Sequence, residues 1–131
     1  MLKLRSAALI AVLIASVFLS PAAPAQAVIP GAATSRLVYD GASITYSGNA
    51  TGWSRIGEVC VTVELSYGTP GGNGSIIWHY IADHQRCGTG SASTPDYTNG
   101  CPNTTVYNAV KVRTIATGPG GTVEDVKWRM L

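Results

Sequence analysis

The sequence predicts an all-β fold, a small antiparallel sandwich or barrel of about six to seven short strands. Segments in which apolar and polar residues alternate recur along the chain, as they do in half-buried strands. Glycine-rich turns such as 68–74 and 118–121 separate these segments, and no segment has a convincing helical pattern. Because there is no internal repeat and no long linker, residues 35–131 are expected to form a single β-domain.

Residues 1–27 have the pattern of a secretory signal peptide. Lys3 and Arg5 precede thirteen uncharged residues, AALIAVLIASVFL, and the small residues at 25–27 match a cleavage site. The apolar run is shorter than the roughly 20 residues of a membrane-spanning helix. We therefore expect a secreted, extracellular protein that has no membrane contact after the signal peptide is removed. The alanine-rich leader points to a bacterial source.

The charge of the chain is balanced once the signal peptide is excluded. Nine Lys and Arg residues stand against seven Asp and Glu residues, and two of the nine, Lys3 and Arg5, lie in the leader. The remaining charges cancel, and the sequence holds no cluster of basic residues. Proteins that bind nucleic acid normally show such a cluster, so no nucleic-acid partner is expected.

The clearest strand pattern covers residues 58–67, after a flexible N-terminal segment at 28–34 and two shorter alternating segments at 36–40 and 43–47. One of its faces carries β-branched and other apolar side chains, whereas the other is mostly polar. We therefore expect one face of this strand to be buried. The apolar positions are Val59, Val61, Val63, Leu65 and Tyr67.

Residues 75–84, SIIWHYIADH, fit either a strand or a helix, and we favour the strand because Ile, Trp and Tyr prefer strands. Residues 105–117 and 123–131 alternate again and complete the predicted strands. Trp78 and Trp128 alternate with apolar neighbours and are expected in the core. The predicted core includes Val61, Val63, Leu65, Val110, Val112 and Trp128.

Three cysteines follow the leader, so one intramolecular disulfide leaves one thiol. The stretch from Cys87 to Cys101 has fifteen residues, mostly small and polar, and a bridge between its two ends would contribute about 3 kcal/mol by restricting the unfolded chain. We favour this pairing, with Cys60 free, because the 87–101 loop has few apolar residues to order it. The alternative is that Cys60 pairs with one of the other two. No spacing matches a zinc site, so neither a metal nor another cofactor is expected.

The stretch HYIADHQRC holds the candidate catalytic residues His79, Asp83 and Arg86. They would serve a small secreted hydrolase, because an imidazole oriented by a carboxylate can act as a general acid or base. On a strand, however, His79 and Asp83 share a face about 13 Å apart, too far for a hydrogen bond. We therefore assign no catalytic residue and keep the hydrolase as an alternative.

A binding role is the favoured function. Tyr97 lies between polar residues and Trp53 directly follows a turn, so both are candidates for exposed aromatic contacts. We expect a small secreted, non-catalytic β-domain that binds an extracellular protein or polysaccharide. It would act like an inhibitor if the 87–101 loop made the contact. A structural protein of the cell surface is a further alternative.

Overall fold

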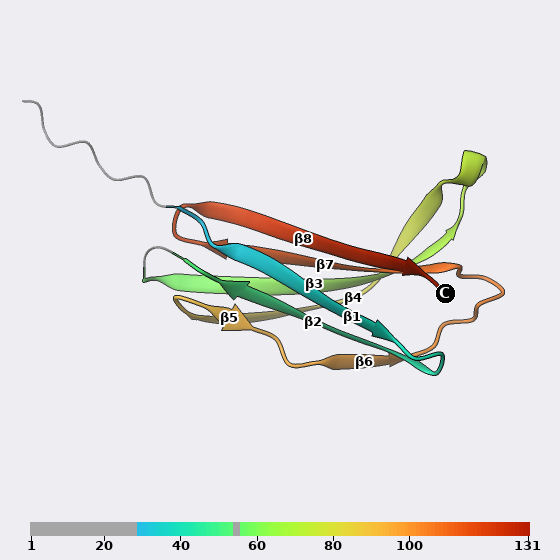
Figure 1. The fold of residues 1–131 in the computed structure, drawn as a ribbon, viewed down its shortest axis with the longest axis horizontal. Coiled ribbons are helices and arrows are strands. Elements are labelled where there is room, and N and C mark those ends of the chain that lie inside the picture. Colours follow the sequence, from blue (N-terminus) through green and yellow to red (C-terminus); the bar gives the residue numbers. More distant parts are fainter. Residues whose placement is uncertain (1–28, 54–55) are drawn as a thin grey trace, which may run out of the picture.

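The computed structural model describes residues 29–53 and 56–131, so the signal peptide predicted at 1–27 lies outside the described residues. Eight β-strands and one short 3-10 turn, η1, make up the described chain (Figure 1). Their bounds are β1 (Ala32–Tyr39), β2 (Ser43–Thr51), β3 (Glu58–Pro70), η1 (Gly72–Gly74), β4 (Ile76–Thr89), β5 (Ala92–Ser93), β6 (Tyr97–Gly100), β7 (Ala109–Gly118) and β8 (Gly121–Met130). None of the described residues forms a helix long and apolar enough to cross a membrane.

The strands form two antiparallel sheets, and their contacting faces enclose the core (Figure 1). In the first sheet, β1 pairs along one edge of β2, and the short strands β5 and β6 pair along its other edge. In the second sheet the order is β4–β3–β7–β8. The predicted all-β fold is therefore confirmed in its sandwich form, since the described strands do not close into a barrel.

The buried core between the sheets is built largely from β3 and β7. The alternation predicted for β3 is confirmed, because its apolar face is buried and its other face is not. Each valine that is buried contributes about 1.5 to 3 kcal/mol of transfer free energy, so these two strands dominate the core. The fully buried residues of β3 and β7 are Val59, Val61, Val63, Leu65, Ala109, Val110, Val112, Thr114 and Ala116.

The ambiguous segment at 75–84 is a strand, because it belongs to β4 and pairs with β3. The turn between these strands needs a left-handed backbone at Asn73 (φ 57°) and Gly74 (φ 74°), which these residue types tolerate. Farther along, the register shifts at a β-bulge after Leu65. The tip of the β3–β4 hairpin, beyond the pair of Gly68 and Ala109, extends past the ends of β7 and β8 (Figure 1).

The N-terminal strand closes one side of the sandwich. β1 begins at Ala32, so part of the segment expected to be flexible at 28–34 is ordered by pairing with β2. The buried Ser35 hydroxyl lies 2.7 Å from the Thr114 hydroxyl and 3.1 Å from the Asp125 carbonyl. These contacts connect β1 to both β7 and β8, and therefore connect the two sheets.

The predicted Cys87–Cys101 disulfide is wrong: Cys60 is bonded to Cys87, and Cys101 is the free cysteine. Residues 87–101 do not form a closed loop, because β5 pairs with the end of β2 and β6 pairs with its beginning. The stretch is ordered by these backbone hydrogen bonds. Because it runs along β2, its own two ends, Cys87 and Cys101, are separated by roughly 20 Å. Cys60 and Cys87, in contrast, lie directly opposite each other on β3 and β4.

Candidate functional site

The last strand, β8, presents its apolar side to the outside of the sandwich. Val126, Trp128 and Met130 are 45%, 55% and 50% exposed, so the prediction that Trp128 belongs to the core is wrong. The register explains this orientation, because Trp128 lies opposite Lys111 of β7, and residues paired in this way share a sheet face. Since the buried side chains of β7 point inward, Lys111 and Trp128 both point outward.

The other side of β8 faces the first sheet and is polar except for Val123, which packs against the core. The Asp125 carboxylate accepts a hydrogen bond from the backbone amide of Ser35 at 2.8 Å. The Arg129 guanidinium lies 5.2 Å from the centre of the Tyr39 ring, within the range of a cation–π contact. Polar contacts therefore attach residues 125–130 of β8 to the first sheet, and the apolar side chains of this part remain on the outer face.

Trp78 reaches the same outer face from β4, at the opposite edge of the sheet. Its partner in the ladder is Gly68 of β3, which has no side chain to keep the indole away. A Cβ atom at Gly68 would lie 2.4 Å from Ile76 Cγ2 and 3.0 Å from Trp78 Cζ3. The Trp78 and Trp128 ring centres are consequently only 6.4 Å apart, in an edge-to-face arrangement.

A lysine completes the arrangement of the two indoles. The Lys111 ammonium nitrogen lies 4.7 Å from the centre of the Trp78 ring. Such a cation–π contact contributes about 0.5 to 1 kcal/mol at an exposed site and restrains the lysine beside both rings. We call this group the tryptophan surface; its residues are Trp78, Tyr80, Lys111, Val126, Trp128 and Met130.

Hydrogen-bonding side chains continue from the tryptophan surface along the outer face. Tyr80 is 63% exposed and donates a hydrogen bond to Asp83 at 2.8 Å, which raises the pKa of the Tyr80 hydroxyl. Arg113 donates to Glu124 at 2.6 and 2.8 Å and lies 3.5 Å from Glu64. The hydrogen bond to Glu124 is the main reason that the pKa of Arg113 is raised. These polar groups are therefore held in defined positions before any ligand arrives.

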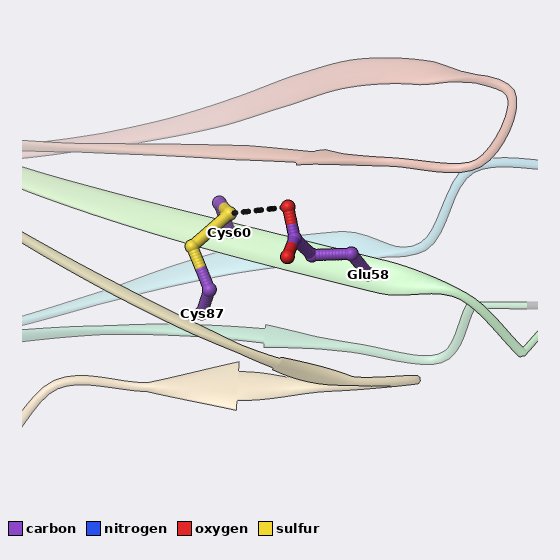
Figure 2. A group of neighbouring side chains, drawn as sticks. All are labelled: Glu58, Cys60 and Cys87. Carbon is purple, nitrogen blue, oxygen red and sulfur yellow. Dashed lines mark hydrogen bonds between the residues drawn. A yellow bond between two sulfur atoms is a disulfide. The ribbon is translucent and has the colours of Figure 1, made fainter.

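The disulfide lies on the same outer face, about 20 Å along the strands from the tryptophan surface. Figure 2 shows Glu58 beside it, with Cys60 Sγ 3.7 Å from Glu58 Oε1. The candidate ligand atoms of Glu58, Cys60 and Cys87 lie within 4.8 Å of one another. Cysteine binds metals as a thiolate, however, and these two sulfurs are bonded to each other. In this form the group is a covalent link between β3 and β4.

The structure does not bring His79, Asp83 and Arg86 together. The bulge in the β3–β4 ladder reverses the alternation, so His79 is on the side of the first sheet while Asp83 is on the outer face. His79 Nε2 lies 2.8 Å from the Thr69 hydroxyl, whereas Asp83 is bonded to Tyr80. Arg86 is on the same side of β4 as His79 but lies seven residues farther along the chain. The shared face expected for His79 and Asp83 is therefore corrected.

Tyr97 and Trp53, the aromatic residues predicted to bind, both pack within the sandwich. Tyr97 stacks on His84 with the ring centres 3.7 Å apart, and its hydroxyl is buried. A Cβ atom at Gly118 would lie 3.0 Å from the Trp53 ring, whose indole nitrogen is buried as well. The structure places neither residue in the tryptophan surface, so their binding roles gain no geometric support.

Sequence reasoning misses the tryptophan surface because the alternation within β8 alone does not show which of its two faces is buried. The two-residue turn at 119–120 fixes the register of β7 and β8, and that register places Trp128 opposite Lys111. The alternation within residues 105–117 places Lys111 and Arg113 on the face opposite the valines. Combining these two observations would have placed Trp128 on the outer face.

No family model matches the chain, and no curated protein matches it in sequence. Among solved structures, the chain is similar to the crystal structure of Spo0M, a sporulation control protein from Bacillus subtilis, with a TM-score of 0.35 and 16% sequence identity. The match covers 78% of this chain and 48% of that chain, so this chain spans about half the length of that protein. A likeness at this level carries no inference about function.

Proposed function

We propose that this chain is a secreted, non-catalytic binding domain that contacts an extracellular protein or polysaccharide through the tryptophan surface. The observation that carries the proposal is the orientation of β8. Val126, Trp128 and Met130 are about half exposed, whereas the polar side of the strand faces the first sheet. Contiguous exposed apolar side chains on a soluble domain commonly mark an interaction site.

The residue types on this surface support a contact role. Tryptophan and tyrosine are enriched among the residues that dominate binding energy, because they offer a large area at a small entropic cost. Covering the exposed half of Trp128 would remove about 100 Å² from water and contribute about 2 to 3 kcal/mol. The contacts of Trp78 with Lys111 and Trp128 reduce the number of conformations that a ligand would have to select.

The disulfide supports an exported role, and the charge balance agrees with a ligand other than nucleic acid. A Cys60–Cys87 bond persists in oxidising compartments outside the cytosol, which agrees with the signal peptide predicted at 1–27. The balanced charge of the remaining chain gives no electrostatic reason to bind nucleic acid.

Retention of material from the producing culture tests this proposal. The protein without residues 1–27 is immobilised through its N-terminus and exposed to culture supernatant and to cell-envelope extract. We expect the wild type to retain a protein or a polysaccharide, identified by mass spectrometry or by sugar analysis. Trp128→Ala should lose this retention, because it removes the most exposed ring of the pair.

Val38→Ala is the matched control, because Val38 is 41% exposed but belongs to β1 in the first sheet. Unfolding midpoints of the three proteins show whether each variant is folded. Equal retention by the wild type, Val38→Ala and Trp128→Ala would contradict the assignment of the contact to the tryptophan surface.

A further inference from the structure

We infer that the ligand of the tryptophan surface is an uncharged polysaccharide that lies on the outer face of the β4–β3–β7–β8 sheet. This inference rests on the proposed function and narrows its ligand to one chemical class. It is carried by the order in which side chains follow each other on this face, by their charges and by the contacts that hold them.

The ladder pairs arrange the outer face in rows that cross all four strands. One row contains Tyr80, Ser66, Lys111 and Trp128, with Trp78 and Met130 in the row beside it. The next row, about 7 Å farther along the strands, contains Asp83, Glu64, Arg113 and Val126. Aromatic rings at one end are thus followed directly by carboxylates and a guanidinium.

This order suits the chemistry of a sugar. A pyranose ring has an apolar face of C–H groups, which packs on an aromatic ring, and an edge of hydroxyls, which needs hydrogen-bond partners. Trp128 offers the ring, while Asp83 and Glu64 accept hydrogen bonds and Arg113 donates them. A row of Gln85, Thr62, Ile115 and Glu124 extends the hydrogen-bonding part, so a chain of several sugars could use the same face.

The charges of the face favour a ligand without negative charge. Its acidic residues are Glu58, Glu64, Asp83 and Glu124, and its basic residues are Lys111 and Arg113. The excess of carboxylates would repel an acidic polysaccharide, and two copies of this face brought together would repel each other for the same reason. A neutral polysaccharide meets no such repulsion, and its hydroxyls can donate to the carboxylates.

The same contacts also restrain the polar groups before binding. Arg113 is held by Glu124 and Glu64, and Asp83 is held by the Tyr80 hydroxyl. Sugar hydroxyls exchange hydrogen bonds with water for hydrogen bonds with protein, so each bond yields little net free energy. Groups that are already positioned lower the entropic cost of binding, which matters most for such a ligand.

Affinity electrophoresis in native gels tests the inference. The gels contain a neutral glucan (hydroxyethylcellulose), a neutral mannan, a neutral xylan or, as the acidic comparison, polygalacturonate. We expect a neutral polysaccharide to retard the wild-type protein, whereas polygalacturonate should not. Trp128→Ala should weaken this binding about tenfold or more, and Val38→Ala should bind like the wild type.

Two further variants separate the role of the ring from loss of folding. Trp128→Phe keeps an aromatic ring and should bind between the wild type and Trp128→Ala. Tyr80→Phe removes the hydroxyl that restrains Asp83 and should weaken binding without lowering the unfolding midpoint, because Tyr80 is exposed.

Absence of retardation in every neutral gel, or equal retardation of the wild type and Trp128→Ala, would overturn the inference. Light scattering after size-exclusion chromatography examines the protein alternative. A dimer that Trp128→Ala dissociates would also overturn the inference, although the tryptophan surface would remain a contact surface. Likewise, an extracellular protein retained by the wild type but not by Trp128→Ala would preserve the proposed function and refute the polysaccharide.

Discussion

At the scale of single residues, the tryptophan surface depends on Gly68, because a glycine leaves room for the Trp78 indole. Gly68 lies on the inner strand β3, in the last row that crosses all four strands, and Trp78 and Ile76 occupy the space that a side chain would fill. Glycine inside a strand normally weakens it, because it packs nothing and restricts the unfolded chain least. Here the cost is offset by the contact between Trp78 and Trp128, which needs this space.

Gly68→Ala should therefore displace Trp78 and disturb its contacts with Trp128 and Lys111. Overpacking of this kind costs about 1 to 3 kcal/mol of unfolding free energy, which urea denaturation measures. The near-UV circular dichroism of the coupled indoles should change as well. Gly100→Ala is the control, because a Cβ atom there meets nothing within 4 Å. Similar stability and spectra for both variants would show that Gly68 does not position Trp78.

A second residue-scale prediction concerns the turn between β1 and β2. The Asp40 carboxylate accepts hydrogen bonds from the backbone amides of Ala42 (2.8 Å) and Ser43 (2.7 Å), and these bonds lower its pKa. A carboxyl group whose pKa is lowered by folding stabilises the fold fully above its ordinary value of 3.8. The contribution is lost as the pH falls through the lower pKa of the folded state.

Asp40→Ala should consequently have a lower unfolding midpoint than the wild type at neutral pH. This difference should shrink as the pH falls below 3.8, the ordinary value for an aspartate. Thermal unfolding of both proteins between pH 7 and pH 2 measures the change. A difference that stays constant over this range would mean that the carboxylate charge does not stabilise the turn.

At the scale of elements, the sequence predicts a strand well where apolar and polar residues alternate within that strand. The valines of β3 and β7 define their buried faces without knowledge of any partner. Residues 87–101 show the opposite case. Their small polar residues carry no period, and β5 and β6 exist because β2 offers backbone partners 42 to 57 residues away in sequence. Local pattern cannot reveal such pairing, which is why the disulfide was misassigned.

The β3–β4 hairpin gives a prediction about the disulfide. The bond joins residues separated by 27 positions, so it should stabilise the domain by about 3 to 4 kcal/mol by restricting the unfolded chain. Replacing both Cys60 and Cys87 by serine should lower the unfolding free energy by this amount. Peptide mapping without reduction should also recover a Cys60–Cys87 peptide.

Cys101→Ser is the control for that double variant, because Cys101 is free and contacts the Tyr39 hydroxyl at 3.6 Å. It should change the unfolding free energy much less. Recovery of a peptide that links Cys101 to either of the other cysteines would contradict the pairing in the structure.

At the scale of the whole molecule, the fold class could be derived from the sequence, whereas only the outward orientation of Trp128 could be derived for the candidate site. Alternation and turns specify strands and a buried face, so a small sandwich or barrel follows, and the pairing of the strands decides between them. The tryptophan surface arises from the register of two hairpins, a β-bulge and the space above Gly68, each of which relates residues in different strands. Trp78 and Trp128 are fifty positions apart in sequence and meet only because these features coincide.

The two ends of the described chain leave the sandwich at opposite ends (Figure 1). β1 starts near the β7–β8 turn, whereas the described residues end at Leu131, directly after Met130 of the tryptophan surface. Attachment to an array or a bead through the N-terminus would therefore present the two indoles away from the support. A fusion partner or affinity tag at the C-terminus would instead emerge beside the indoles and mask them. The choice of terminus decides whether a displayed copy of this domain can reach its ligand.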